Sequence, residues 1–313
     1  MNQKTKGYIL GTIAAATYGM NPLFALPLYK DGMNPESVLF FRYLLAIPIL
    51  AVMIHARGRS FRVSRKETLT LIVMGLLVAV SSLTLFQSYN FMEAGIASTI
   101  LFVYPIMVAV IMALVFKEKI SLQTALCMAL ALGGIALLYK GPDGATLSLI
   151  GTVLALASAL TYAIYIVGIN QTTLRNTATL TVTFYVLVFG VSLFIIRLLT
   201  GVELTTPSHW YMWANILALS IFPTAISFLC TTSAIQYIGS TPTAILGALE
   251  PVTAIFFGIT VFGERMTARE GLGIVMILIA VTFVIAGGSI TLQMTRFRKM
   301  FPKLPRRRRQ KQD

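Results

Sequence analysis

The sequence predicts an all-α polytopic membrane protein with ten transmembrane helices in two inverted five-helix repeats. Three observations predict this fold class: the composition, the number of long apolar runs, and an internal repeat. The chain has 313 residues, of which 57% are hydrophobic and only 12% charged, whereas soluble domains carry about 25% charged residues. A soluble globule of this size needs more polar residues than these to face water.

Ten apolar runs are long enough to cross the hydrocarbon core of a bilayer, which requires roughly 20 helical residues. The first run exceeds the apolar stretch of a signal peptide, roughly 7–15 residues, so it is retained as helix one. In the first half of the chain the runs cover residues 7–29, 37–56, 69–91, 94–116 and 123–139. In the second half they cover residues 147–169, 178–200, 213–238, 243–262 and 271–290.

The distribution of basic residues predicts the orientation. Ten spans return the chain to its starting side, so both termini share one face of the membrane. Of the 25 Lys and Arg residues, nineteen fall on the side of the termini and five on the opposite side, while Arg42 lies within the second span. Basic loops favour the cytoplasm, so we expect both termini to be cytoplasmic and the loop at 140–145 to lie outside.

An internal repeat has an offset of 146 residues. This offset separates Pro105 from Pro251, and it also separates Glu118 from Glu264. We therefore expect two halves, 1–145 and 146–290, followed by a basic tail at 291–313. Because each half has an odd number of spans, the second half must be inverted in the membrane. Inverted repeats place a substrate path between the halves near the bilayer midplane.

The pattern resembles the EamA-type branch of the drug/metabolite transporter (DMT) superfamily. The resemblance rests on the two five-helix halves, on Phe-Arg-Tyr-Leu-Leu-Ala at 41–46, and on Glu250-Pro251 followed by Phe-Gly-Glu-Arg at 262–265. It covers residues 7–290 and leaves the tail outside. It implies a transporter that exports or exchanges small metabolites, including amino acids and nucleotide-related compounds, across the bacterial inner membrane.

Two prolines predict breaks in spans four and nine. Pro105 and Pro251 leave the carbonyls of Leu101 and Gly247 without their helical donors. In a membrane such groups must find another partner or line a wet cavity. A packing kink is the alternative for either proline alone, but their repeat-related positions favour a role in gating. We therefore expect Pro105, Pro251 and Gly247 to mark the centre of the path.

Two charged residues, Glu250 and Arg42, lie well inside spans, where a charge costs roughly 2.5–3.5 kcal/mol on insertion scales. Glu250 is the candidate for proton coupling or for contacting a positive group of the substrate. A structural hydrogen bond to Ser or Thr is its alternative. Arg42 is interpreted as reaching the interface from near a helix end. The carboxylates of Glu93, Glu118 and Glu264 lie at helix ends and are interpreted as structural.

Polar and aromatic residues at helical spacing predict a substrate site. Tyr162 and Tyr165 share a face with Ser158, and aromatic packing is the alternative for this stripe. A cavity with tyrosine rings, amides and one carboxylate would suit a zwitterion with an apolar side chain, such as an aromatic amino acid. The substrate-binding candidates are Tyr18, Asn21, Gln87, Asn90, Tyr104, Tyr162, Tyr165 and Glu250.

The sequence does not predict an enzyme, and we expect no catalytic residues, no cofactor and no metal site. The two histidines are far apart in loops, and the chain lacks a phosphate-binding G-x-x-x-x-G-K-[ST] motif. Gly7 and Gly11 form a GxxxG pattern that is typical of close helix packing. The basic tail is expected to contact anionic lipid and not nucleic acid. A facilitative channel and a non-transporting scaffold are the alternative functions.

Overall fold

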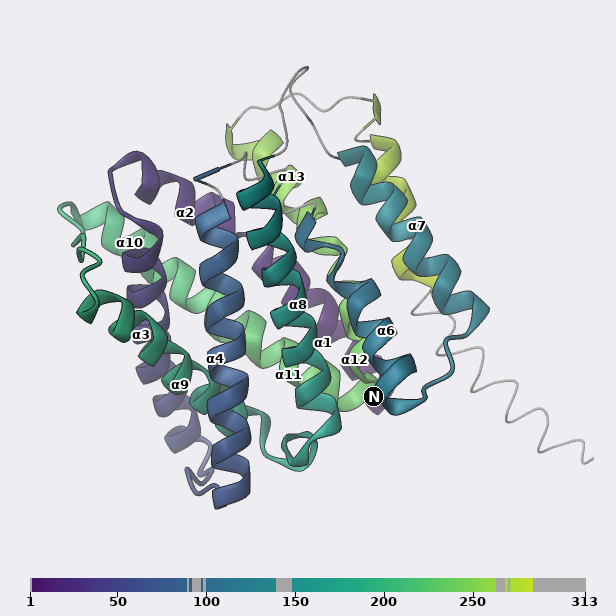
Figure 1. Cartoon of the computed structure of the whole chain (residues 1–313), viewed down its shortest axis with the longest axis horizontal. Coiled ribbons are helices and arrows are strands. Elements are labelled where there is room, and N and C mark those ends of the chain that lie inside the picture. The colour runs from purple at the N-terminus through teal and green to yellow at the C-terminus, as the bar shows by residue number, and fades with distance from the viewer. Residues whose placement is uncertain are drawn as a thin grey trace, which may run out of the picture.

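The computed structural model describes residues 2–88, 90–91, 97, 100–138, 148–262, 268–269 and 271–283, and every regular element within them is a helix. The helices stand side by side in one bundle (Figure 1). In the first half they are α1 (Gln3–Tyr18), α2 (Asn21–Lys30), α3 (Pro35–Ala56), α4 (Arg65–Ser88), α6 (Tyr104–Phe116) and α7 (Leu122–Leu138). In the second half they are α8 (Leu149–Gln171), η1 (Thr173–Asn176), α9 (Thr179–Leu199), α10 (Trp210–Leu219), η2 (Ser220–Ile226), α11 (Ser227–Ile238), α12 (Ser240–Leu246) and α13 (Leu249–Phe262). Residues 271–283 form a further helix.

Six helical segments in the described part of the chain are long and apolar enough to cross a membrane. They correspond to predicted spans one, two, three, six, seven and eight, and they cover Gln3–Lys30, Pro35–Ala56, Arg65–Ser88, Leu149–Gln171, Thr179–Leu199 and Trp210–Ile238. The other predicted spans contain shorter helices, among them Tyr104–Phe116 and Gly271–Phe283. The chain is therefore a multi-pass α-helical membrane protein.

Several predicted features lie outside the described residues. They are Glu93 and most of the start of span four, the loop at 140–145, the repeated motif at 263–267 with Glu264, the end of span ten, and the tail at 291–313.

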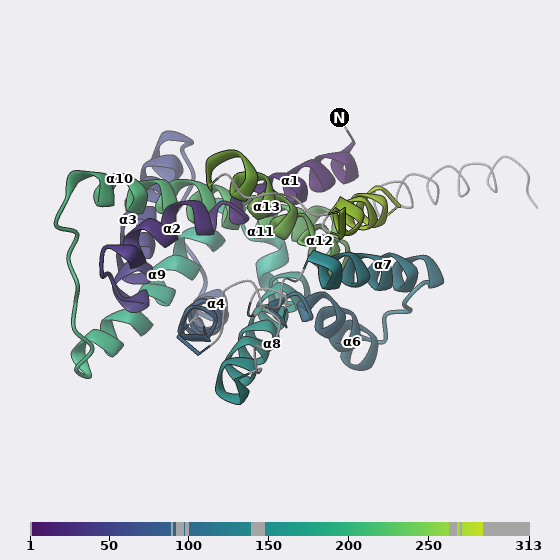
Figure 2. The same cartoon turned by 90° about the horizontal axis from the view of Figure 1, so that it is seen from above.

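Seen from above, α2, α3, α9 and α10 gather at one end of the bundle, and α6, α7 and α12 at the other (Figure 2). Helix α1 packs along α11 through the predicted GxxxG pattern. A Cβ atom on Gly7 would lie 2.6 Å from Ile238 Cγ2 at the end of α11, and one on Gly11 would lie 3.6 Å from Ala234 Cβ in α11 and 2.5 Å from Leu246 Cδ1 in α12. The expected role of this pattern in close packing is confirmed, because larger residues would push α1 away from α11 at Gly7 and from α12 at Gly11.

Helices α4 and α8 cross through a pair of serines. The hydroxyl groups of Ser81 and Ser158 lie 3.0 Å apart, and the Ser158 hydroxyl donates to the Ser81 carbonyl at 2.7 Å. Ser158 is fully buried by this contact. It therefore holds α4 and α8 together.

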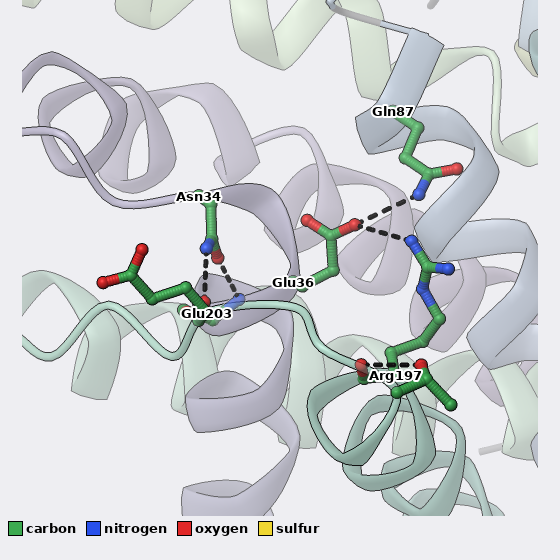
Figure 3. Close-up of polar contacts among 7 residues, drawn as sticks. Asn34, Glu36, Gln87, Arg197 and Glu203 are labelled. Atoms are coloured by element: carbon green, nitrogen blue, oxygen red, sulfur yellow. Dashed lines mark hydrogen bonds and ion pairs between the residues drawn. The ribbon is translucent and has the colours of Figure 1, made fainter.

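A polar network joins the ends of α3, α4 and α9 (Figure 3). Glu36 in the first turn of α3 accepts hydrogen bonds from Gln87 Nε2 at 3.1 Å and from Arg197 Nη2 at 3.4 Å. Nearby, the Asn34 side chain donates to the Glu203 carbonyl at 2.7 Å. The orientation predicted from basic residues would place this network at the outer face of the membrane.

Candidate functional site

The predicted breaks in spans four and nine are both present. Helix α6 begins at Tyr104 and α13 begins at Leu249, each after a two-residue turn. Pro105 and Pro251 therefore occupy the first turn of the half-helix that follows, where a missing N–H leaves no helical bond unmade. The breaks thus lie just before the prolines, at Phe102–Val103 and Gly247–Ala248.

The two breaks contact each other directly. The Tyr104 hydroxyl donates a hydrogen bond to the Ala244 carbonyl at 3.2 Å. A Cβ atom at position 247 would overlap that hydroxyl, so glycine is needed for this approach. The prediction that the Gly247 carbonyl has no hydrogen-bond donor is wrong, because this carbonyl accepts a hydrogen bond from the Glu250 N–H at 2.9 Å. The chain tightens into an i to i+3 turn here, which satisfies the carbonyl locally.

Span one, predicted as the apolar run 7–29 with Pro22 inside it, is also broken. Helix α1 ends at Tyr18, and α2 starts at Asn21 with Pro22 in its first turn. Gly19 in the break rests against span nine: a Cβ atom on it would overlap the Glu250 carbonyl and lie 2.8 Å from Thr253 Cβ. Three interrupted spans therefore meet around Glu250.

Arg42 is the main correction to the sequence analysis, because it does not reach the interface. Its side chain is 0% exposed. Its guanidinium donates to Thr224 Oγ1 at 2.6 Å, to Asn21 Oδ1 at 2.9 Å and to the Pro223 carbonyl at 3.3 Å. It also lies 5.8 Å from the centre of the Tyr18 ring. Arg42 thus holds the break in span one against span eight.

The geometry of span eight explains these contacts. Between α10 and α11 the chain forms the π-helix η2, which contains Pro223. Proline leaves the Leu219 carbonyl without its helical donor, and the Thr224 hydroxyl donates to that carbonyl at 2.7 Å. The same hydroxyl accepts from Arg42. Arg42 therefore compensates for backbone irregularity in span one, at Asn21, and in span eight, at Pro223.

Four predicted tyrosines gather around these breaks. Tyr104 packs edge to face on Tyr162 with ring centres 4.9 Å apart, and Tyr162 stacks on Tyr165 at 6.0 Å. Phe228, which the sequence analysis did not select, lies 6.3 Å from Tyr165 and 6.4 Å from Tyr18. These rings form one contiguous aromatic cluster, contributed by spans one, four, six and eight.

Glu250 supplies a carboxylate to this cluster from the first turn of α13. The residue is 8% exposed and lies close enough to Tyr104 and Tyr162 for electrostatic interaction. Among the described residues, no Ser, Thr or other side chain makes a hydrogen bond to its carboxylate. A buried carboxylate needs a hydrogen bond or a countercharge, so it is placed to accept a proton or a positive ligand group.

The structure does not bring Gln87 and Asn90 to this cluster. Gln87 binds Glu36 near the end of α4, and Asn90 is exposed and donates its backbone N–H to the Gln87 carbonyl at 3.1 Å. Glu36, the partner of Gln87, precedes Arg42 by six residues on α3. At 1.5 Å per residue this places Glu36 about 9 Å from Arg42 along the helix axis, so Gln87 lies away from the centre. Asn21, by contrast, reaches the centre through Arg42.

A pocket that sequence reasoning missed lies beside α12. It encloses about 220 Å³ between α1, α6, α7 and α12, and Ala109 and Ile245 line it. Ile245 is the neighbour of Ala244, which accepts the Tyr104 hydrogen bond. The pocket therefore lies next to the contact between the breaks of spans four and nine. Among the described residues, no group of three His, Cys, Asp or Glu side chains could hold a metal ion.

The family model for EamA-like transporters matches residues 5–140 and again 149–286. The chain belongs to the EamA-like transporter family. It is therefore a membrane transporter by family, and the resemblance to the DMT superfamily is confirmed.

Individual relatives of this EamA-like chain extend over most of its length. An uncharacterized transporter of Archaeoglobus fulgidus is 26% identical over 86% of this chain and 92% of its own. The uncharacterized transporter YvbV of Bacillus subtilis is 24% identical over 90% of this chain and 92% of its own. A crystal structure aligns with a TM-score of 0.74 at 17% identity, covering 94% of this chain and 99% of the other, which supports the fold.

Proposed function

We propose that this chain is a secondary transporter that works by alternating access and exports or exchanges small amino-acid-like metabolites. The observation that carries the proposal is the meeting of three interrupted spans around Glu250 and the tyrosine cluster. Half-helices that end near the midplane are the usual substrate and ion sites of secondary transporters. Tyrosine rings favour an apolar or aromatic side chain, so aromatic amino acids fit the site best.

The proposed architecture is ten spans in two inverted halves, 1–145 and 146–290, in the inner membrane of a bacterium. The two family matches, of similar length, support this division. Equivalent breaks before Pro105 and Pro251 support it as well. Both termini would be cytoplasmic, with the tail at 291–313 on anionic lipid.

In this proposal Glu250 has one of two functions at the centre of the path. It carries a proton during the cycle, or it contacts the positive group of the solute. Its lack of a described hydrogen-bond partner supports both functions over a structural one. The break between α12 and α13 next to it would let the two half-helices move separately during the cycle.

A flux assay in proteoliposomes tests the proposed function. Amino acids, nucleosides and cationic drugs are offered with and without a pH gradient. We expect saturable counterflow of amino acids and accumulation driven by a solute or proton gradient. Flux that does not saturate and never runs uphill would indicate a channel instead. Absence of flux for every solute would indicate a scaffold.

A further inference from the structure

The positive charge of Arg42 has no counter-ion in the described part of the chain. Its three hydrogen-bond partners are a hydroxyl, an amide oxygen and a backbone carbonyl, all uncharged. The only ion pair among the described residues joins Arg197 to Glu36. A buried charge without an opposite charge is costly, and its presence inside a membrane span is by default a sign of function.

The start of α2 adds positive potential at the same place. Asn21 is the first residue of α2, and the preceding Met20 makes no side-chain capping hydrogen bond. The N-terminus of a helix carries a partial positive charge and free N–H groups, which favour anions. Arg42 contacts this N-terminus through Asn21. A fixed cation and a helix dipole therefore act on one point near the centre of the bundle.

Glu250 lies on the other side of the same break. Gly19 touches the Glu250 backbone, while Asn21, two residues later, binds Arg42. The Tyr18 ring lies beside the guanidinium and belongs to the aromatic cluster. A cationic group, an aromatic surface and a carboxylate thus surround one interruption of span one. The cationic group is opposite in charge to the carboxylate of a zwitterion, and the Glu250 carboxylate is opposite in charge to its ammonium group.

We propose that Arg42 binds the carboxylate of the transported solute, an inference that rests on the proposed transport function. A guanidinium has five N–H groups, and three of them donate to the partners named above. Asn21 Oδ1 occupies the position of one carboxylate oxygen while the site is closed. When span one moves, the solute carboxylate replaces this oxygen, which gives the charge-assisted pairing that arginine favours.

Three probes that share a phenyl ring test the proposal: L-phenylalanine, 3-phenylpropionate and phenethylamine. The first two carry a carboxylate, and the third does not. Competition for L-phenylalanine counterflow in proteoliposomes gives the affinity of each probe. We expect phenethylamine to bind at least about tenfold more weakly than L-phenylalanine, since a hydrogen bond to a charged group is worth at least this factor.

Two variants separate binding from folding. Arg42→Gln should reduce L-phenylalanine affinity at least about tenfold and leave phenethylamine unchanged. Asn21→Asp is nearly isosteric and gives Arg42 an internal carboxylate, so it should keep the protein folded while it reduces L-phenylalanine affinity. Arg59→Gln, an exposed arginine outside the site, removes the same charge and should change neither affinity.

The outcomes distinguish this inference from the proposed function. Equal affinity for L-phenylalanine and phenethylamine in the wild type overturns the carboxylate site and leaves the transport function intact. Wild-type L-phenylalanine affinity in a folded Asn21→Asp variant overturns it too. If none of the three probes is transported, the proposed substrate class fails, and the inference fails with it.

Discussion

Replacing Gly247 with alanine should destabilise the protein, because the breaks of spans four and nine touch at this residue. The Gly247 backbone has φ −56° and ψ −22°, which alanine adopts without strain. Any loss of stability in this variant therefore comes from steric overlap of the new Cβ atom and not from backbone strain. The new Cβ atom would overlap the Tyr104 hydroxyl and lie 3.0 Å from the Ala244 carbonyl oxygen. Tyr104 is 1% exposed and has little room to move.

The size of the effect follows from these contacts. Moving Tyr104 breaks its hydrogen bond to Ala244, worth about 0.5–1.5 kcal/mol, and overpacks a buried ring, which costs about 1–3 kcal/mol. Gly247→Ala should lower the free energy of unfolding by about 1.5–4.5 kcal/mol in total. Tyr104→Phe removes the overlapping atom and should cost the hydrogen bond alone. The double variant should therefore cost less than the sum of the two single variants.

Reversible unfolding in mixed micelles measures these free energies, with Gly133→Ala as the control. A Cβ atom on Gly133 would meet only the terminal methyl group of Met276, at 3.0 Å, and that flexible group can move. Gly247→Ala as stable as Gly133→Ala would refute the close contact between the breaks. Strict additivity of Gly247→Ala and Tyr104→Phe would refute it as well.

Three further predictions concern other parts of the bundle. Glu36→Gln should lower the free energy of unfolding by less than about 1 kcal/mol, because its ion-pair partner Arg197 is 40% exposed. Glu203→Gln is the control, and a loss of more than about 1 kcal/mol relative to this control would contradict that reasoning. Gly11→Val should cost about 1–3 kcal/mol by overpacking α1 against Leu246 of α12, and an unchanged unfolding midpoint would disprove this tight contact. In a cysteine-free background, an impermeant maleimide should label Glu203→Cys but not Arg59→Cys in intact cells, whereas the reverse pattern would overturn the orientation.

The sequence analysis succeeded where the signal is local. Apolar runs located the six long helices, because hydrocarbon thickness sets their length. Pro105 and Pro251 indicated the breaks in spans four and nine, because the effect of proline is confined to its own turn. Tyrosine spacing at 162 and 165 placed those rings in one cluster for the same reason.

The analysis failed where a residue depends on distant partners. Arg42 was interpreted as reaching the interface because its partner Thr224 lies 182 positions away and could not be recognised from the local sequence. Pro22 is a local signal for the break in span one, but the contact of Gly19 in that break with Glu250 in span nine is not local. Gln87 had suitable helical spacing for the site, but the fold brings it to Glu36 instead. Lone charges in spans are the signal that could have led to Arg42, provided that its partners are sought in other spans.

The central claim is that the three breaks meet at the centre of the transport path, with Glu250 as its functional carboxylate. Glu250→Gln keeps the shape of the side chain and removes its charge. Transport by this variant should be measured in proteoliposomes both as solute exchange and as uphill movement driven by a pH gradient, with Glu203→Gln as the control. Loss of uphill transport alone is expected for proton coupling, and loss of affinity in both modes for contact with a solute amine. Normal transport in both modes would contradict the claim and leave Glu250 a structural carboxylate.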